Sequence, residues 1–536
     1  MTLENILFPE ITDTPENILQ KYPKRPAGKV VTRIAPSPTG FLHIWAVYSA
    51  MLDKIVAHKN NWIFFLRIED TDQKREVEGA AKKYVEILKK FWLEFDEWPI
   101  WPNGEDVGNY GPYTQSQREY IYKVFIKDLV KKGLAYPCFL TEEEITATRE
   151  IQEASKVPTG IYKEYSPWRY ASFEDIKKAL SEKKEFVVRL KSSWELTKKI
   201  EVEDLIKWKI STQENFLDIV ICKSSWIPTY HFAHLIDDHL MGTTHVIRWD
   251  EWFASVPLHY ELFRMMNWEI PKYAHYGPLV KIDGDSRRKL SKRKDAEADV
   301  EFYFQNGYFI EAILDFLSNI LNAWFEDWRK QNLEASYLDF DFKLERINSA
   351  WALVDMDKLT FVNAAYIKNL PIEKLYQALG EYLQTFEEGF YENVFLKAEK
   401  KYNIAILTEL KTRLTTLKEF IALTWFFYND FEMNEERKSL LINPKMKIEN
   451  LDIVKKWLQL ALDVLSAKNN DFENIEEIKN IFVEEIKNAE MKNWQVLWPV
   501  RVALSGEEFS PGALELIFIL GREKSIQRIK KVLNFI

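Results

Sequence analysis

Two segments of the sequence carry side chains that could stabilise a negatively charged phosphate. His43 follows the Pro- and Gly-containing turn at residues 36–40, and an apolar, helix-compatible stretch comes next. A helix that begins after such a turn offers free N–H groups and the positive end of its dipole to a phosphate. The second segment is Lys289–Lys294, part of a stretch from residue 281 to 294 with seven basic and two acidic residues. Such cations stabilise the charge that develops during phosphoryl transfer.

A guanidinium group binds a carboxylate through two parallel hydrogen bonds, so an arginine such as Arg33 or Arg248 could hold a carboxylate substrate. Each of these residues also has a simpler interpretation. An isolated arginine commonly forms a surface salt bridge, a single histidine at a helix start is commonly a cap or core residue, and a run of lysines is commonly a solvated loop. The surrounding elements must decide between these interpretations.

The elements around these residues alternate between strand and helix. Val30–Ala35 and Ile63–Ile68 are typical of buried strands, and Val47–Ala57 and Glu76–Leu93 are typical of helices. A strand, a helix and a strand with short connections predict a parallel sheet with a right-handed crossover. In such a sheet a ligand binds at the carboxyl ends of the strands.

The alternation resumes after a Lys- and Glu-rich region, which we interpret as an insertion. Strands are predicted at Phe216–Cys222, His245–Ile247 and Ala274–Val280, and helices near His231–His239 and Ser255–Asn267. Beyond Asp295 the strand signals fade. Apolar periodicity there predicts helices at Ile310–Leu321, Ile404–Phe427, Ile453–Leu465 and Leu514–Leu533.

Size and composition exclude several classes of protein. A chain of 536 residues should form roughly three or four domains. No apolar run reaches the roughly 20 residues that span a bilayer, and the acidic start at Met1–Gln20 is not a signal peptide. Cys138 and Cys222 form no Cys/His set with metal-ligand spacing, so we expect no structural zinc. We expect a cytoplasmic protein without a membrane partner. The net charge of −9 does not exclude a nucleic acid, because binding depends on local basic surface.

Seven segments between Lys29 and Asp295 resemble, in order and spacing, the signatures of glutamyl-tRNA synthetases. The first, residues 31–44, contains the HIGH-type motif of class I synthetases, and the last, Lys289–Arg293, resembles the KMSKS loop. The other five are Leu66–Asp72, Gly111–Ser116, Pro228–Ala233, Asp237–Gly242 and Val246–Arg248.

The resemblance implies ATP-dependent ligation of L-glutamate to the terminal adenosine of tRNA(Glu), through a glutamyl-adenylate. The implied catalytic residues are His43, Lys289 and Lys292. The implied ATP-binding residues are Gly40, His43, Trp45, Glu251, Leu290, Ser291 and Lys292. The implied glutamate-binding residues are Arg33, Ala35, Ser37, Glu69, Tyr230, His234 and Arg248, and His234 stands where other members carry Asn. Mg²⁺ should arrive with the ATP, because it prefers water and phosphate oxygens to a protein cage.

The implied fold is an α/β, Rossmann-type parallel-sheet catalytic domain with an inserted α+β domain, followed by an all-helical C-terminal tRNA-binding region. Residues 29–132 and 214–294 are the two catalytic halves, and residues 133–213 are the insertion that binds the acceptor stem. Residues 295–370 form a helical stem-contact domain and residues 371–536 a helical anticodon-binding domain. Residues 1–28 are an extension without an assigned role. The family suggests a monomer whose activation step needs bound tRNA.

Two relatives fit the sequence less well. Glutaminyl-tRNA synthetase typically has Pro-Glu-Pro-Asn-Gly where this chain has Pro-Ser-Pro-Thr-Gly at residues 36–40, and its anticodon-binding part is a β-barrel. A shorter relative that glutamylates a modified tRNA base lacks the anticodon-binding half. Whether tRNA(Gln) is charged in addition to tRNA(Glu) stays open.

The chain departs from the family where members carry glycine and this sequence carries tryptophan. It has 17 glycines and 19 tryptophans, and glycine makes up about 3% of the residues against a usual value of about 7%. At Trp45, inside the HIGH-type motif, an indole would occupy the space of the nucleotide. The same replacement occurs at Trp62, Trp92, Trp98, Trp208, Trp226, Trp249, Trp351 and Trp494, whereas Trp252 and Trp328 match family tryptophans.

We interpret these tryptophans as products of conceptual translation, because some bacterial lineages read the opal codon as glycine. Overpacking a filled site costs roughly 1–3 kcal/mol, and natural domains are stable by only about 5–15 kcal/mol, so drift does not explain so many changes in one direction. The alternative is a catalytically inactive, tRNA-binding paralogue in which Trp45 is genuine. The presence of His43, Glu69, Arg248 and Lys292 argues against it.

Overall fold

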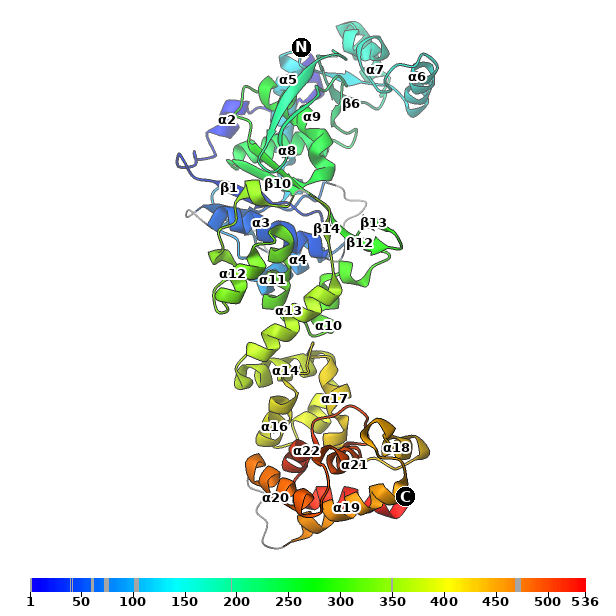
Figure 1. Ribbon diagram of the computed structural model, residues 1–536. Coiled ribbons are helices and arrows are strands. Elements are labelled where there is room, and N and C mark those ends of the chain that lie inside the picture. The colour runs from blue at the N-terminus through cyan, green and yellow to red at the C-terminus, as the bar shows by residue number, and fades with distance from the viewer. Residues whose placement is uncertain are drawn as a thin grey trace. The chain divides into compact units, whose positions relative to one another are not determined.

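The computed structural model describes residues 2–38, 40, 42–58, 62–71, 77–100, 106–193, 195–348, 350–467 and 474–536. Thr39, Phe41 and Asp72 of the segments named above, and the predicted helix start at Glu76, lie outside these residues. The chain divides into two compact units (Figure 1). Residues 1–300 with 314–355 form the first unit, and residues 301–313 with 356–536 form the second.

The first unit contains the parallel strands that the sequence predicts. β1 (Val31–Ile34) pairs in parallel with β2 (Ile63–Leu66), and α3 (Ile44–His58) connects them. β10 (His245–Trp249) pairs in parallel with β11 (Lys272–Tyr276). All four residues of β1 are buried, as expected for a parallel strand that is covered on both faces. The predicted α/β class is confirmed.

Thr244 joins these two pairs of strands. Its N–H donates to the carbonyl of Val31 at 3.1 Å, and the Val31 N–H donates to Thr244 Oγ1 at 2.8 Å. β1 and β10 are therefore neighbours, and their carboxyl ends lie at the same edge, where open α/β sheets bind ligands. In Figure 1, α3 lies on one side of these strands, and α8 (Tyr230–Leu240) and α9 (Val256–Met265) lie on the other.

The single strand predicted over residues 274–280 is two strands. The break falls at Pro278, which has no N–H to donate to a sheet ladder. β11 ends before it, and β12 (Leu279–Asp283) begins after it. β12 pairs antiparallel with β13 (Ser286–Lys289) across a turn at Gly284, whose φ of +60° suits glycine. β13 leads directly into the basic loop at residues 289–294.

Among the described residues beyond Asp295, one short strand accompanies the predicted helices. β14 (Ala352–Leu353) pairs in parallel with Leu279 and Val280 of β12. Two residues are too few to show the period-two alternation by which a strand is recognised in a sequence.

The inserted region mixes helices and strands, as predicted. α6 (Glu142–Ala154) and α7 (Phe173–Ser181) accompany the antiparallel strands β5 (Ala135–Cys138) and β6 (Val187–Leu190). β6 also pairs with β9 (Val220–Cys222), which lies just beyond the region and forms the end of the strand predicted over Phe216–Cys222. Near the end of the region, β7 (Lys199–Asp204) and β8 (Trp208–Gln213) form a hairpin. β7 also pairs in parallel with β11 through Asp204 and Tyr273, so the last hairpin of the insertion extends the β10–β11 sheet.

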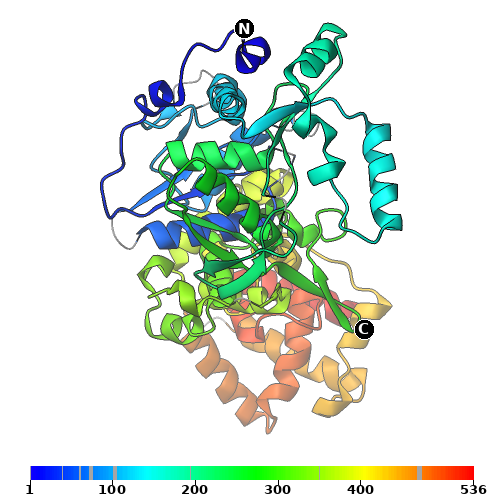
Figure 2. The same ribbon diagram turned by 90° about the horizontal axis from the view of Figure 1, so that it is seen from above.

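The N-terminal extension is fastened to the first unit. α1 (Leu3–Leu7) and α2 (Pro15–Leu19) pack beside α5 (Glu119–Lys131), and α1 is seen next to that helix in Figure 2. The Lys127 ammonium donates to the carbonyls of Phe8 and Ile11 at 3.1 and 2.7 Å. Arg25 pairs through both terminal nitrogens with Glu97 at 2.6 and 2.9 Å. The extension therefore belongs to the fold of this unit.

The second unit is helical in the residues that the structure describes. Its core is formed by apolar side chains of helices between residues 356 and 535. The helix predicted over Ile404–Phe427 is two helices, α16 (Lys400–Leu410) and α17 (Glu419–Tyr428). The helix predicted over Leu514–Leu533 is also divided, into α22 (Ala513–Leu520) and α23 (Arg522–Phe535), because Gly521 has a φ of +78°. Apolar periodicity continues across both breaks and hides them.

Candidate functional site

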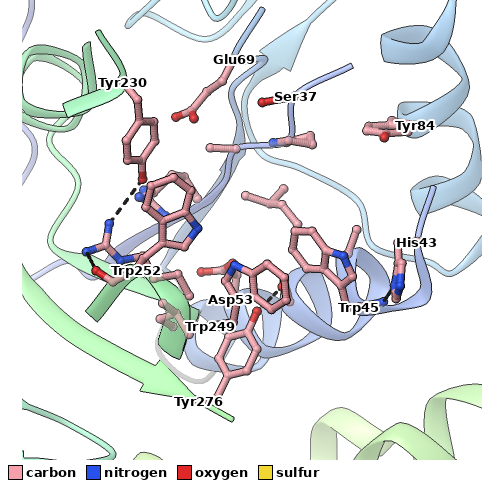
Figure 3. A pocket seen from close by; sticks show the side chains of 18 of the residues that line it. Ser37, His43, Trp45, Asp53, Glu69, Tyr84, Tyr230, Trp249, Trp252 and Tyr276 are labelled. Carbon is pink, nitrogen blue, oxygen red and sulfur yellow. Dashed lines mark hydrogen bonds between the residues drawn. The ribbon is translucent and has the colours of Figure 1, made fainter. Parts of the chain in front are cut away.

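A cavity of about 420 Å³ lies at the carboxyl ends of β1 and β10 (Figure 3). The turn after β1, the first half of α3, the segment after β2, the start of α8 and the end of β10 contribute to its wall. Most of the predicted site residues line it, namely Arg33, Ala35, Ser37, His43, Trp45, Glu69, Tyr230, Arg248 and Lys292. The structure thus brings both arginines, the histidine and a lysine of the basic loop to one cavity.

A second cavity of about 230 Å³ shares His43, Trp45 and Lys292 with the first. Lys289 and Leu290 also line this second cavity. Four predicted residues line neither cavity: Gly40, His234, Glu251 and Ser291. His234 is fully buried, with Nδ1 3.2 Å from Asp238 Oδ2. Glu251 forms an ion pair with Lys289.

Arg248 presents a buried positive charge to the larger cavity. Its side chain is on β10, and only 7% of the residue is exposed. The guanidinium donates to Tyr230 Oη at 3.3 Å, the Trp252 carbonyl at 3.2 Å and His275 Nε2 at 3.0 Å. Among the described residues it forms no ion pair with a carboxylate. A buried cation with only neutral partners is costly to keep, and an anion in the cavity would remove that cost.

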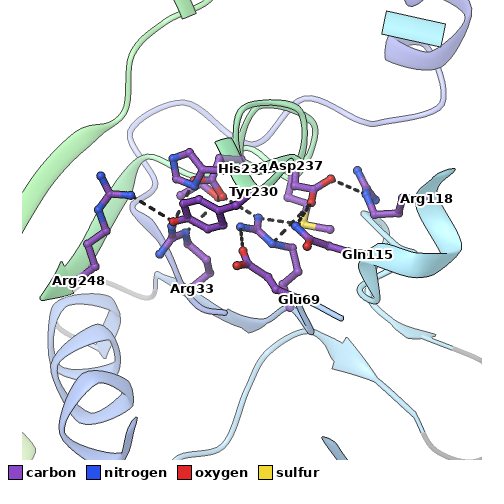
Figure 4. Close-up of polar contacts among 12 residues, drawn as sticks. Arg33, Glu69, Gln115, Arg118, Tyr230, His234, Asp237 and Arg248 are labelled. Carbon is purple, nitrogen blue, oxygen red and sulfur yellow. Dashed lines mark hydrogen bonds and ion pairs between the residues drawn. The ribbon is translucent and has the colours of Figure 1, made fainter. Parts of the chain in front are cut away.

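Arg33 differs from Arg248 because it already has a carboxylate partner. Its Nε and Nη2 lie 3.3 and 3.4 Å from the two oxygens of Asp238. Asp238 also accepts from Arg67 at 2.7 Å, and Arg67 donates to Glu69 at 2.8 Å. Figure 4 shows Arg33 and Glu69, which lie at the two ends of this network. These contacts join β1, the β2 end and α8 beneath the cavity. Removing one partner from such a buried network leaves an unpaired charge.

Glu69 occupies the end of this network and faces the cavity. Desolvation raises the pKa of its carboxyl group above the ordinary value, and the adjacent Arg67 guanidinium opposes that rise. The carboxylate can accept hydrogen bonds from a further cation, such as an ammonium group, because Arg67 is bonded to one oxygen only.

His43 can donate a hydrogen bond from Nε2. Burial and the nearby Lys292 ammonium together lower the pKa of His43 to about 3, so the ring is neutral at pH 7. The N–H of Trp45 donates to His43 Nδ1 at 3.1 Å, which leaves the ring hydrogen on Nε2. This contact uses the backbone of residue 45 and does not depend on its side chain. Lys292 is exposed, and partial desolvation lowers the pKa of its ammonium group.

Two indoles occupy the space between His43 and β10. The rings of Trp45 and Trp249 stack with centroids 4.9 Å apart and planes inclined by 10°, and both line both cavities. The Lys289 ammonium lies 5.3 Å from the centroid of the Trp249 ring. The stacked rings fill the slot between His43 and the end of β10, so a planar ligand could enter it only in their place (Figure 3).

The lining residues of the larger cavity that sequence reasoning did not assign to the site include Asp53, Tyr84, Lys223 and Tyr276. Asp53 is only 1% exposed, and its Oδ1 has no hydrogen-bond partner in the described part of the chain. Burial raises the pKa of this carboxyl group well above its ordinary value. A carboxylate in the mainly apolar helix α3 was a signal that the sequence offered.

The described residues contain no group of three or more His, Cys, Asp and Glu side chains that could hold a metal ion. A search of the same residues for a helix of sufficient length and hydropathy to cross a membrane found none.

The chain matches two protein families along most of its length. The family described as "tRNA synthetases class I (E and Q), catalytic domain" matches residues 29–360. An "Anticodon binding domain" matches residues 374–533. Together these matches cover both the cavity and the helical second unit.

Curated relatives and solved structures agree with this match. The glutamate–tRNA ligases of Clostridium perfringens strain SM101 and Acetivibrio thermocellus are each 37% identical to this chain, with 99% of each chain covered. A crystal structure of a glutamate tRNA ligase from Elizabethkingia meningosepticum, in complex with its amino acid, has a TM-score of 0.80 and 29% identity, and covers 94% of this chain and 99% of that one. The glutamate-tRNA synthetase of Elizabethkingia anophelis has a TM-score of 0.79 at 28% identity, with 94% and 100% covered.

Proposed function

This chain belongs to the class I tRNA synthetases of the E and Q family, and from that premise we propose that it is a glutamate–tRNA ligase. It activates L-glutamate with ATP and transfers the glutamyl group to the 3′-terminal adenosine of tRNA(Glu). We place it in the cytoplasm, as a monomer. The observation that carries the choice of substrate is the buried Arg248 guanidinium, which has no carboxylate partner among the described residues and faces a cavity that Arg33 also lines.

A dicarboxylic amino acid matches this cavity in charge. One carboxylate neutralises Arg248 through paired hydrogen bonds, and Tyr230 Oη, already 3.3 Å from that guanidinium, is placed to donate to the same group. The substrate ammonium fits Glu69, whose carboxylate is at the cavity wall. Arg33, held by Asp238, adds a second positive charge.

In the first step a carboxylate oxygen of glutamate attacks the α-phosphorus of ATP, and the bond to the pyrophosphate oxygen breaks. Negative charge grows on the phosphate oxygens, and the His43 Nε2–H and the Lys292 ammonium line the cavity as donors that can stabilise it. Mg²⁺ bound to the phosphates of ATP supplies further charge neutralisation when the nucleotide binds. In the second step a ribose hydroxyl of the tRNA attacks the glutamyl carbonyl, and AMP leaves.

Charging assays test this function. The protein isolated from its natural source should attach labelled glutamate to a tRNA(Glu) transcript, and it should exchange labelled pyrophosphate into ATP when that tRNA is present. A tRNA(Gln) transcript in the same assay decides whether the enzyme also charges that tRNA. Absence of charging with both transcripts, in a preparation that still binds tRNA, would favour the inactive paralogue.

We further propose that the natural protein carries glycine at Trp45, Trp249 and the related positions. Three of these positions, Trp92, Trp208 and Trp226, have φ values of 55°, 67° and 67°. This left-handed region is a clear outlier for a bulky side chain and is natural for glycine. Nine non-glycine residues in the described part of the chain have positive φ, and three of them are tryptophan, although tryptophan makes up only 19 of 536 residues.

The local structures at these three positions also favour glycine. Trp92 follows Phe91, the C-cap of α4 (Ala80–Lys90), and a left-handed glycine is the commonest residue at that position. Trp208 begins β8 at the β7–β8 turn, and Trp226 lies in the turn before α8, where its N–H donates to the Lys223 carbonyl. The side chain of Trp208 is 66% exposed, so packing does not compensate for its backbone conformation.

Mass spectrometry of the protein from its natural source distinguishes the two sequences. The tryptic peptide from residue 249 to 264 contains both Trp249, where we expect glycine, and Trp252, where we expect tryptophan. One glycine and one tryptophan in that single peptide would support the proposal, with position 252 as the internal control. A peptide mass that fits two tryptophans would show that the indole at position 249 is genuine.

A further inference from the structure

We propose that Asp204 and His275 position Arg248 for glutamate binding, although neither residue lines the cavity. The inference rests on the proposed function, because it assumes that Arg248 binds a substrate carboxylate. Arg248 Nε donates to His275 Nε2 at 3.0 Å, and His275 Nδ1 lies 2.6 Å from Asp204 Oδ2. All three residues are buried: Arg248 is 7% exposed, His275 0% and Asp204 4%.

The protonation state of His275 follows from its two neighbours. Arginine Nε always carries a hydrogen, so His275 Nε2 must be the acceptor in their contact. The ring hydrogen therefore sits on Nδ1, and Asp204 accepts it. Desolvation lowers the pKa of His275 to about 4, so the imidazole is neutral at pH 7. A neutral ring of this tautomer gives Arg248 a fixed acceptor.

Asp204 is itself held by backbone groups. Its Oδ1 accepts from the N–H groups of Ile206 and Lys207 at 3.0 and 2.9 Å. The His275 N–H lies 3.2 and 3.1 Å from the two carboxylate oxygens. Burial acts to raise the pKa of Asp204, but the hydrogen bonds from His275, Lys207 and Ile206 outweigh it and lower that pKa, so Asp204 is a carboxylate at neutral pH. The backbone N–H groups of the turn after β7 therefore hold the Asp204 carboxylate in place, and the carboxylate in turn orients the His275 imidazole.

The three residues lie on three adjacent strands. Arg248 of β10 is opposite His275 of β11, and β11 pairs with β7 through Tyr273 and Asp204. Directly opposed side chains on neighbouring strands lie on the same face of a sheet and touch. With Nε held from below, the two terminal nitrogens of Arg248 lie toward Tyr230 Oη and the Trp252 carbonyl. The guanidinium is thus oriented before substrate binds, which reduces the entropy lost on binding.

Asp204→Asn is the sharpest test, because it changes the hydrogen bonding and hardly changes the shape. An amide that keeps its oxygen toward Ile206 and Lys207 turns its NH₂ group toward His275 Nδ1. The ring hydrogen then moves to Nε2 and faces the Arg248 Nε–H. The opposite amide orientation loses both backbone contacts instead. We expect the Kd for L-glutamate to rise by about tenfold to a hundredfold.

Two substitutions of His275 separate positioning from packing. His275→Phe removes the acceptor and should weaken glutamate binding as strongly as Asp204→Asn. His275→Gln offers a carbonyl oxygen near the place of Nε2 and should restore most of the affinity. The matched control is His245→Gln, because His245 lies at the other end of β10 and contacts Thr244 Oγ1. Calorimetry with the full chain gives the Kd for L-glutamate, and the Kd for tRNA(Glu) is measured in parallel.

The expected result is weaker glutamate binding in Asp204→Asn and His275→Phe, with tRNA binding unchanged and with recovery in His275→Gln. Wild-type glutamate affinity in the first two variants would overturn the inference. Equal loss of glutamate and tRNA binding, or no recovery with glutamine, would show a role in folding only and would also overturn it. If the unsubstituted chain binds tRNA but no glutamate, the proposed function fails first, and the inference fails with it.

Discussion

When the chain is expressed with the tryptophans of the printed sequence, the double substitution Trp45→Gly and Trp249→Gly is expected to raise its affinity for ATP by about a hundredfold or more. The two indoles stack 4.9 Å apart and fill a slot between His43 and β10. Relieving an overpacked site is worth roughly 1–3 kcal/mol for each group removed. Either single substitution should have a smaller effect, because the remaining indole can move into the vacated half of the slot. Calorimetric titration with ATP measures the change.

Trp252→Gly is the matched control for this experiment. Trp252 lines the same cavity, but its ring packs on Tyr230 with centroids 4.4 Å apart and does not stack on Trp45. We expect no gain in ATP affinity from this substitution. Unchanged ATP affinity in the double variant, with the fold intact, would mean that the indoles do not block the nucleotide.

Replacing Arg248 with alanine is expected to weaken L-glutamate binding by about a hundredfold to a thousandfold. Truncating one partner of a buried charge pair costs roughly 2–5 kcal/mol, and the substrate carboxylate would then enter the cavity without its partner. Arg248→Lys should lose nearly as much, because an ammonium group cannot donate together to His275, Tyr230 and a carboxylate in one plane. Steady-state pyrophosphate exchange with tRNA, or direct titration with glutamate, provides the measurement.

Arg248→Ala should leave the Tm of the protein unchanged or raise it. In the absence of substrate, Arg248 is a buried cation without a carboxylate partner among the described residues, so its removal eliminates a desolvation cost. Arg264→Ala is the control, because Arg264 lies on α9 and contacts Glu214 at 3.5 Å at a more exposed site. A lower Tm in Arg248→Ala would contradict the argument that the unpaired buried charge is costly. Normal glutamate binding in that variant would contradict the assigned role of Arg248.

Local patterns in the sequence were sufficient to predict the core of the first unit. β1, β2, α3 and α8 form near their predicted ranges because each has one strong period and clear ends. Elements that depend on distant partners were not predicted. β14 exists because β12 offers it an edge, and the breaks at residues 411–418 and Gly521 interrupt helices without interrupting apolar periodicity.

The candidate site shows the same division. Arg33, His43, Arg248 and Lys292 stand in segments recognisable by their sequence, and the structure places all four around one cavity. The Asp204–His275 contact joins residues 71 positions apart, and nothing in either segment indicates the other. Trp92, Trp208 and Trp226 were marked as unusual by sequence comparison, but only backbone angles show that their positions favour glycine.

The β7–β8 hairpin limits how this enzyme can be dissected into parts. By sequence it closes the segment 133–213, which a protein engineer would excise or exchange as a module. By structure its first strand is the outermost support of Arg248, two strands away across the sheet. If the insertion of another synthetase is transplanted into this chain, the junction should therefore lie before Lys199, so that this chain keeps its own Asp204. A junction after Gln213 would replace the residues that support the amino-acid pocket with foreign ones.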